Sequence, residues 1–283
     1  MKTLTDAYTL HNGVNIPCVG FGTWQTPDDE TGVVAVKKAL EVGYRHIDTA
    51  AGYDNERSVG IAVKESGIPR EDIFVTSKLD NSDHGYEATV KAFEKTMKEL
   101  DMDYLDLYLI HWPNPIKFRD HWKEANAGSW KAFEEFYKAG RIKAIGVSNF
   151  RPHHIEALLE TAEIKPMVNQ IRLCPGDIHK ETTDYCQKNN IILEAYSPLG
   201  TGQVFDVPEM KELAKLYHKS IAQICLRWSL QMGYLPLPKS VTLERIEENA
   251  QLFDFELNSG DVEMMANLTD CCGTSKDPDE TNF

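Results

Sequence analysis

The chain has 283 residues, 42% of them hydrophobic, which is enough to bury a large core. Its formal charge is −14, with 44 acidic residues against 30 basic ones. Nucleic acids and anionic membranes are bound by basic surfaces, so the charge excludes both as predicted partners and leaves room only for a local basic pocket around one phosphate.

The first segment, MKTLTDAYTLHNG, contains no apolar stretch that would indicate a secretory signal. Within it, Asn12-Gly13 lies between two alternating segments, a pattern that predicts a β-hairpin with a two-residue turn. We expect this hairpin to cover the bottom of the fold that follows.

Short apolar segments and amphipathic segments then alternate along the chain. The predicted strands are residues 18–21, 46–48, 73–77, 105–111, 142–147, 167–170, 191–195 and 235–237. The predicted helices are residues 31–43, 56–67, 86–101, 129–140, 152–162, 180–190, 208–219 and 221–233. Eight strands that alternate with helices predict an α/β fold, a (β/α)₈ TIM barrel that forms one domain over residues 1–283, with extra helices near the C-terminus.

Two segments interrupt this alternation. Residues 112–128, after the fourth strand, are expected to be a long loop at the active face. The acidic tail from Cys271 is expected to be solvated or disordered. The six cysteines show no CxxC spacing, and Cys271 and Cys272 are adjacent, which rarely permits a disulfide. We therefore expect reduced thiols and a cytoplasmic protein. We also expect a monomer or a weak dimer.

Polar side chains follow three consecutive predicted strands. Asp48 ends the second strand, Lys78 follows the third, and His111 ends the fourth, while Tyr53 begins the loop after the second. The carboxyl ends of barrel strands converge on one mouth, so we expect these four catalytic candidates to face one cavity.

The predicted chemistry is proton donation by a tuned phenol. A phenol has a pKa near 10, and an ammonium about 4 Å away favours its phenolate by roughly 4 kcal/mol before opposing effects. Asp48 would keep Lys78 charged and oriented. Tyr53 could then give a proton to a carbonyl oxygen, and an N–H of His111 could orient that oxygen.

Eight motifs in this order resemble the aldo-keto reductases: GFGTWQ, RHIDTAAGYDNE, TSKL, IHWP, GVSNF, VNQ, EAYSPLG and PKSVTLERIEEN. The resemblance runs over residues 20–249. It implies a (β/α)₈ barrel that reduces carbonyl compounds with NADPH by direct hydride transfer. The family's catalytic tetrad falls on Asp48, Tyr53, Lys78 and His111. The chain has no GxGxxG motif, so a Rossmann site is not expected.

The same resemblance implies the cofactor-binding residues. These are Gly22, Thr23, Trp24, Asp48, Ser148, Asn149, Gln170, Tyr196, Ser197, Pro198, Leu199, Gly200, Lys239, Ser240, Val241, Thr242, Arg245, Glu248 and Asn249. Tyr196 would stack on the nicotinamide, and the group from Lys239 to Arg245 would surround the adenosine 2′-phosphate. This placement also agrees with the phosphate sites that barrels build after the eighth strand.

The substrate pocket is expected to be walled by Trp24, Tyr53, His111 and Trp112. Three residues depart from the family pattern, because Asp80 replaces a frequent Trp, and Arg172 and Cys174 replace a frequent Glu and His. Together with the short tail, the resemblance is to the bacterial branch that includes reductases of 2,5-diketogluconate and small aldehydes. A small polar carbonyl compound, such as a dicarbonyl or a keto-sugar, is therefore the expected substrate.

Two other functions stay open. Lys78 could form a Schiff base, as in a barrel aldolase, although a Lys78 held charged by Asp48 is a poor nucleophile. The barrel could also bind NADPH as a redox sensor without turnover. No metal site is expected, since His153 and His154 lack an acidic partner at metal spacing and should be exposed. No role is expected for His84, His121, His179 or His218.

Overall fold

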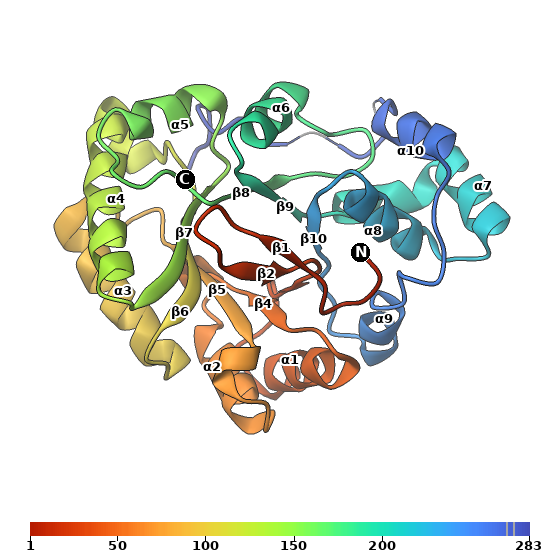
Figure 1. Cartoon of the computed structure of the whole chain (residues 1–283), viewed down its shortest axis with the longest axis horizontal. Coiled ribbons are helices and arrows are strands. Elements are labelled where there is room, and N and C mark those ends of the chain that lie inside the picture. The colour runs from red at the N-terminus through yellow and green to blue at the C-terminus, as the bar shows by residue number, and fades with distance from the viewer. Residues whose placement is uncertain (270, 274) are drawn as a thin grey trace.

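The computed structural model describes residues 1–269, 271–273 and 275–283. At its centre are eight parallel strands, each hydrogen-bonded to the next in chain order. They are β3 (Phe21–Gly22), β4 (His46–Asp48), β5 (Phe74–Leu79), β6 (Leu105–Ile110), β7 (Ile142–Ser148), β8 (Val168–Arg172), β9 (Ile192–Tyr196) and β10 (Leu235–Leu237). The predicted (β/α)₈ barrel is confirmed (Figure 1).

The barrel closes between its first and last strands. Gly20 N donates to the carbonyl of Pro236 at 3.1 Å, and Gly22 N donates to the carbonyl of Pro238 at 2.9 Å. Glycine at position 20 allows this close approach, because a Cβ there would lie 2.5 Å from Cδ2 of Leu237 and 2.7 Å from Nδ1 of His46, and these side chains would have to shift. The closed sheet leaves no unpaired edge between β10 and β3.

Ten α-helices and four 3₁₀ turns in the described residues connect and follow these strands. The α-helices are α1 (Glu30–Val42), α2 (Glu56–Glu65), α3 (Tyr86–Leu100), α4 (Trp122–Lys138), α5 (Pro152–Leu159), α6 (Lys180–Lys188), α7 (Pro208–Tyr217), α8 (Ile221–Gln231), α9 (Leu243–Glu248) and α10 (Ser259–Ala266). The 3₁₀ turns are η1 (Ala51–Tyr53), η2 (Arg70–Asp72), η3 (Ile116–His121) and η4 (Gly200–Asp206).

Local signals explain how several helices begin and end. Asp29 caps α1 by accepting from the Thr31 N–H, and Gly43 ends it at φ 119°, a left-handed conformation that favours glycine. Ser220 and Gln223 form a reciprocal capping box at the start of α8. The extra helices near the C-terminus are α9 and α10, which follow β10.

The segment expected as a long loop is partly helical. Residues 116–121 form η3, and α4 begins at Trp122 rather than at Ser129. Gly128, the last residue of the expected loop, lies inside α4, where a Cβ would be 2.9 Å from the Tyr86 nitrogen. Glycine at this position therefore allows α4 to approach α3 closely.

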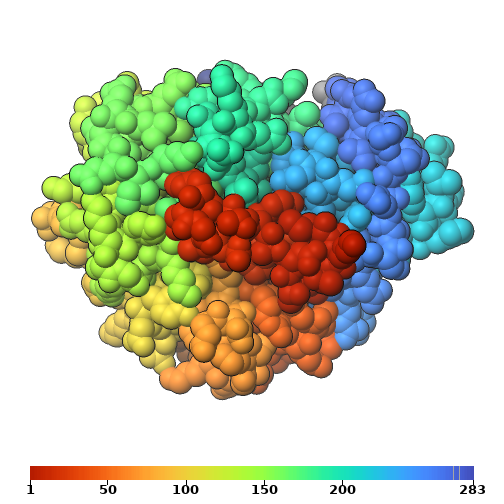
Figure 2. All heavy atoms as spheres, in the orientation of Figure 1, coloured from red at the N-terminus to blue at the C-terminus, as the bar shows by residue number. Residues whose placement is uncertain are grey.

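The N-terminal hairpin consists of β1 (Ala7–Thr9) and β2 (Asn15–Pro17). Its turn is one residue longer than expected, because Leu10 pairs with Val14 and Gly13 takes the left-handed conformation at φ 88°. Asn12 donates to the carbonyl of Lys143 at 3.0 Å, near the start of β7. The hairpin therefore covers the bottom of the barrel, and it lies across the centre of the face shown in Figures 1 and 2.

The end of the chain is ordered by contacts with the barrel, so the expectation of a solvated or disordered tail is wrong for residues 275–283. Ile116 N donates to the carbonyl of Phe283 at 2.9 Å, and Asn114 Nδ2 donates to Asp279 Oδ1 at 3.0 Å. Arg119 donates to the carbonyl of Thr281. We refer to residues 275–283 as the tail strap.

Buried apolar side chains from the hairpin, the strands and the inner faces of the helices form one connected core. It reaches from Leu10 in the hairpin to Cys272 near the tail strap. Within the part of the chain that the structure describes, no helix combines the length and apolar character that crossing a membrane requires.

Candidate active site

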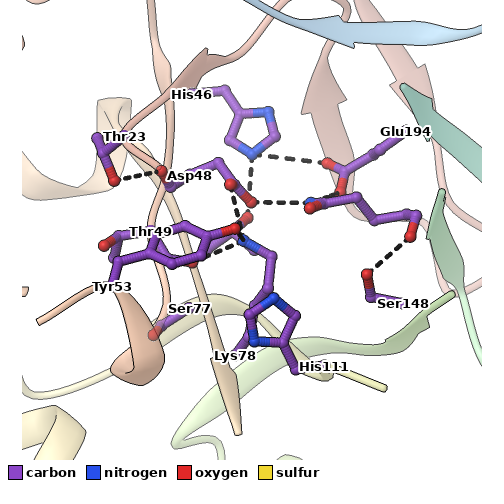
Figure 3. Close-up of polar contacts among 12 residues, drawn as sticks. Thr23, His46, Asp48, Thr49, Tyr53, Ser77, Lys78, His111, Ser148 and Glu194 are labelled. Carbon is purple, nitrogen blue, oxygen red and sulfur yellow. Dashed lines mark hydrogen bonds and ion pairs between the residues drawn. The ribbon is translucent and has the colours of Figure 1, made fainter. Parts of the chain in front are cut away.

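Three strand ends bring the four predicted catalytic side chains together (Figure 3). Nζ of the fully buried Lys78 donates to Asp48 Oδ1 at 2.7 Å, to the carbonyl of Thr49 at 2.8 Å and to the hydroxyl of Tyr53 at 3.3 Å. All three ammonium hydrogens therefore have a partner. The His111 ring packs edge-on against the Tyr53 ring, with the centroids 5.6 Å apart.

The loop after β4 is fixed by a buried amide that the sequence interpretation missed. Asn55 Nδ2 donates to the carbonyls of Thr23 and Thr26, each at 2.8 Å, while Asn55 Oδ1 accepts from the hydroxyl of Thr49 at 2.7 Å. These bonds join the loop after β3 to the loop that carries Tyr53. The short turn η1 then directs the phenol back toward Lys78.

The electrostatics of the phenol differ from expectation. Burial raises the pKa of Tyr53, and the opposing effect of Lys78 does not cancel this, in part because Asp48 also raises it. Burial alone would lower the pKa of Lys78, but Asp48 and Tyr53 outweigh burial and raise it. Tyr53 is therefore a phenol at neutral pH, hydrogen-bonded to a firmly charged ammonium.

His111 is neutral in this environment. Burial, together with the charge of Lys78 and the neighbouring His84, holds the pKa of His111 well below its usual range. A neutral imidazole still has one N–H to donate. His111 can therefore orient an oxygen atom beside Tyr53 without competing for its proton.

Side chains from β7, β8 and β9 extend the site on the other side of Lys78. Gln170 Nε2 donates to Asp48 Oδ2 at 2.8 Å, and the hydroxyl of Ser148 donates to the carbonyl of Gln170 at 2.7 Å. The hydroxyl of Tyr196 donates to Asn149 Oδ1 at 2.8 Å, and Asn149 has the left-handed conformation at φ 62°. These polar groups come from adjacent strand ends and surround one mouth.

This geometry agrees with a comparison to known proteins. Residues 18–270 match the sequence model of the aldo/keto reductase family. The chain belongs to this family. It is therefore an oxidoreductase, and its fold is the (β/α)₈ barrel of its solved relatives.

Relatives cover nearly the whole chain. A glyoxal reductase of Bacillus subtilis (strain 168) is 48% identical over 281 residues, which are 99% of each chain. A methylglyoxal reductase of Escherichia coli (strain K12) is 41% identical over 273 residues, 96% of each chain. The crystal structure of a Bombyx mori aldo-keto reductase in complex with NADP has a TM-score of 0.84 at 35% identity, and the match covers 94% of this chain and 92% of that one.

The remaining predicted cofactor residues of this aldo-keto reductase lie around the same mouth. Gly22 is at the barrel closure, and the hydroxyl of Thr23 donates to the carbonyl of Asp48 at 2.9 Å. Trp24 is 50% exposed. Residues 197–200 form the turn after β9, where Ser197 has φ 47° and Gly200 has φ 54°.

The last group follows β10. Lys239 and Arg245 are exposed, and neither pairs with a carboxylate among the residues that the structure describes. The backbone N–H of Thr242 donates to the buried Ser240 hydroxyl at 3.0 Å. α9 begins directly after Thr242 and carries Arg245. The other predicted members of this group are the exposed Val241, the half-buried Glu248 and the buried Asn249.

The tail strap alters the expected pocket wall. Trp112 is mostly buried, because the Phe283 ring packs edge-on against it with the centroids 5.0 Å apart. Arg172 is engaged with Asp177 and with the carbonyl of Cys272, so its guanidinium is not free for a ligand. Cys174 is fully buried.

Asp80 is the one departing residue at an accessible position. It is half-buried, and its Oδ1 accepts from the backbone N–H of Ser82 at 2.9 Å and from the Ser82 hydroxyl at 2.7 Å. Its other oxygen faces Gly52 in the turn before Tyr53, where a Cβ would lie 2.8 Å away. This carboxylate therefore borders the turn that carries the phenol.

The two adjacent histidines are not both exposed, contrary to expectation. His154 is fully buried, its Nε2 lies 2.9 Å from Asp279 Oδ1, and its Nδ1 accepts from the backbone N–H of Arg151 at 3.1 Å. His153 Nε2 lies 3.2 Å from Asp279 Oδ2. The acidic partner was missed because it lies 125 positions along the chain. Since Nδ1 of His154 is an acceptor, Nε2 carries the proton and is a donor to Asp279 rather than a metal ligand.

Proposed function

We propose that this aldo-keto reductase uses NADPH to reduce small, polar aldehydes and ketones, such as dicarbonyls or keto-sugars, to alcohols, with Tyr53 as the proton donor. The observation that carries the proposal is the Tyr53 hydroxyl 3.3 Å from an ammonium that is itself ion-paired with Asp48. NADPH would supply the hydride that adds to the carbonyl carbon.

The chain's own residues manage the proton. Tyr53 retains its proton at neutral pH because burial raises its pKa, so its hydroxyl has a proton to donate. When the proton moves to the developing alkoxide, the charge of Lys78 stabilises the phenolate that remains. Asp48 keeps Lys78 charged, and the neutral His111 offers an N–H to the carbonyl oxygen. General acid catalysis of this kind contributes about 10²- to 10⁴-fold.

Two features of the chain support NADPH as the cofactor. The cations Lys239 and Arg245 lack carboxylate partners in the described residues, which leaves them free for a phosphate dianion. Ser148, Asn149, Gln170 and Tyr196 gather polar groups beside the tetrad, where the nicotinamide carboxamide would lie. The NADP-bound relative supports the same assignment by similarity.

Two observations support a small polar substrate. Trp112 and Phe283 form one aromatic wall, and Asp80 places a carboxylate near the turn that carries Tyr53. The relatives named for reduction of glyoxal and methylglyoxal act on substrates of this class. We expect a bulky apolar substrate to require displacement of the tail strap, because Phe283 packs on Trp112, a predicted residue of the pocket.

The test is NADPH oxidation by the purified protein with glyoxal, methylglyoxal and a nitrobenzaldehyde. Tyr53→Phe should lower kcat at least about 100-fold, because the ring remains and only the proton donor is lost. Tyr185→Phe is the matched control. Tyr185 is a half-buried residue on α6, so this variant should retain activity. Near-normal turnover by Tyr53→Phe would contradict the assigned donor.

Two further measurements test the two alternatives. An aldolase would be trapped on Lys78 by borohydride in the presence of a carbonyl compound, but the three hydrogen bonds and raised pKa of Lys78 disfavour a free amine. A redox sensor would bind NADPH tightly and show no turnover with any aldehyde.

A further inference from the structure

A second carboxylate lies behind the tetrad, fully buried inside the barrel. Glu194 projects from β9, and its Oε2 accepts from Gln170 Nε2 at 2.8 Å. Its other oxygen, Oε1, has no hydrogen-bond partner among the described residues and lies 3.6 Å from Nε2 of the buried His46 (Figure 3). A buried carboxylate with so few partners is costly unless it is neutral or has a function.

The amide of Gln170 connects this carboxylate to the tetrad. Nε2 of Gln170 donates one hydrogen to Glu194 Oε2 and the other to Asp48 Oδ2, both at 2.8 Å. Only the nitrogen end of an amide can donate to two acceptors, so the two carboxylates fix which way the amide points. The amide oxygen is left for other partners.

The charges around Glu194 determine its protonation. The ionisable groups that face it are Asp48 and His46 on β4 and Lys78 on β5, while β10 contributes none. Burial, with a further contribution from Asp48, raises the pKa of Glu194 to about 8. Burial lowers the pKa of His46 to about 3, so this ring stays neutral. At neutral pH Glu194 is therefore protonated, and Asp48 is the one anion that Lys78 faces in the part of the chain that the structure describes.

We propose that Glu194 is a positioning residue of the reductase, which holds the Gln170 amide in place with Asp48 and, when it ionises, weakens proton donation by Tyr53. This inference rests on the proposed function. A second negative charge behind Asp48 would disfavour the phenolate that Tyr53 must become. At a pH below the pKa of Glu194 the site has one anion, Asp48, and at a pH above it the site has two.

The decisive variant is Glu194→Gln, which keeps the size and an acceptor for Gln170 but cannot ionise. In the wild type, kcat should fall severalfold between pH 7 and pH 9. In Glu194→Gln this fall should disappear. The Kd for NADPH of Glu194→Gln should differ from that of the wild type by less than about twofold. Glu134→Gln, a buried carboxylate on α4 that accepts two backbone N–H groups, is the control and should keep the wild-type pH profile.

A second variant tests positioning. Glu194→Leu removes the acceptor, so the Gln170 amide can rotate, and NADPH binding measured by fluorescence quenching should weaken about two- to tenfold. Unchanged binding in this variant would overturn the positioning role. If Glu194→Leu does not fold, the pH profile of Glu194→Gln still decides, since an unchanged fall near pH 8 would overturn the proposal.

A measurement without activity separates this inference from the proposed function. The pKa of Glu194 rises from 4.5 in the unfolded chain to about 8 in the folded protein. Between pH 4.5 and pH 8, the folded protein therefore keeps a proton on Glu194 that the unfolded chain has lost. Stability of the wild type should therefore fall relative to Glu194→Gln as pH rises from 5 to 8. A Tm difference that does not change with pH would show that Glu194 holds no proton. If the Tm difference between the wild type and Glu194→Gln changes with pH as expected but the protein does not oxidise NADPH, only the proposed function is rejected.

Discussion

At the scale of single residues, the site depends on one buried cation, Lys78, on which burial and a neighbouring carboxylate have opposite effects. Burial lowers the pKa of Lys78, and Asp48 reverses that effect. The tetrad positions were predictable because side chains at consecutive strand ends must converge. The raised pKa of Tyr53 was not predictable, since the cost of burial depends on packing that the sequence does not display.

Asp48→Asn should expose this dependence. Without the carboxylate, burial should lower the pKa of Lys78, so the phenolate of Tyr53 loses its stabilising charge and kcat falls by about tenfold or more. Leaving the ammonium buried and unpaired should also cost about 3–5 kcal/mol of stability. The pH dependence of kcat and urea unfolding measure the two effects. Asp103→Asn, at an exposed position, is the control.

We expect the preference for NADPH over NADH to depend on single residues as well. Arg245→Ala should raise the KM for NADPH by about tenfold and leave the KM for NADH nearly unchanged, because the lost cation would contact only the 2′-phosphate. Steady-state kinetics with both cofactors measure this. Equal losses for the two cofactors would contradict the assignment.

At the scale of elements, the alternation of strands and helices was visible in the sequence, whereas contacts between distant segments were not. Glu194 was missed although it interrupts the apolar segment IILEAY, which is itself a signal of a buried charge. The partner of His154 was missed because Asp279 belongs to the tail strap. Composition marked this tail as solvated, but Asn114 and the histidines satisfy its carboxylate.

The tail strap should be released by Asp279→Ala. Burial alone would raise the pKa of Asp279, but hydrogen bonds from Asn114 and His154 outweigh burial and hold it below 3.8. The carboxylate is therefore charged at neutral pH, and the stability it contributes is lost only as acid protonates it. Amide hydrogen exchange of residues 275–283 should become faster in the variant.

The substrate preference of Asp279→Ala should shift as well. With Phe283 free to leave Trp112, kcat/KM for an aromatic aldehyde should rise severalfold relative to methylglyoxal. Glu280→Ala, at an exposed neighbouring position, is the matched control and should change neither the exchange nor the preference. An unaltered exchange rate in Asp279→Ala would show that other contacts hold the tail.

At the scale of the whole molecule, the two ends of the barrel have separate tasks. The hairpin at the bottom contributes buried apolar residues, while strand ends and loops at the other end carry the polar site. The connected core supports the proposal that residues 1–283 form one domain. The sequence pattern predicted the barrel itself, because eight apolar segments in alternation with amphipathic helices have few other solutions.

Ile16→Ala in the hairpin tests this separation. The side chain is fully buried, so its truncation should cost about 2–5 kcal/mol in urea unfolding. Methylglyoxal kinetics of the folded variant should be unchanged, because Ile16 lies in the hairpin at the opposite end of the barrel from the site. His11→Ala, in the exposed turn, should alter neither quantity.

The placement of the two termini has a practical consequence for handling the enzyme. Met1 lies with the hairpin beneath the barrel, whereas Phe283 is bonded to Ile116 and rests on Trp112 at the opposite rim. An affinity tag or a surface linker fused after Phe283 would start beside Trp112, one of the predicted residues of the substrate pocket. Attachment through the amino end should leave the face with the catalytic candidates turned toward the solution.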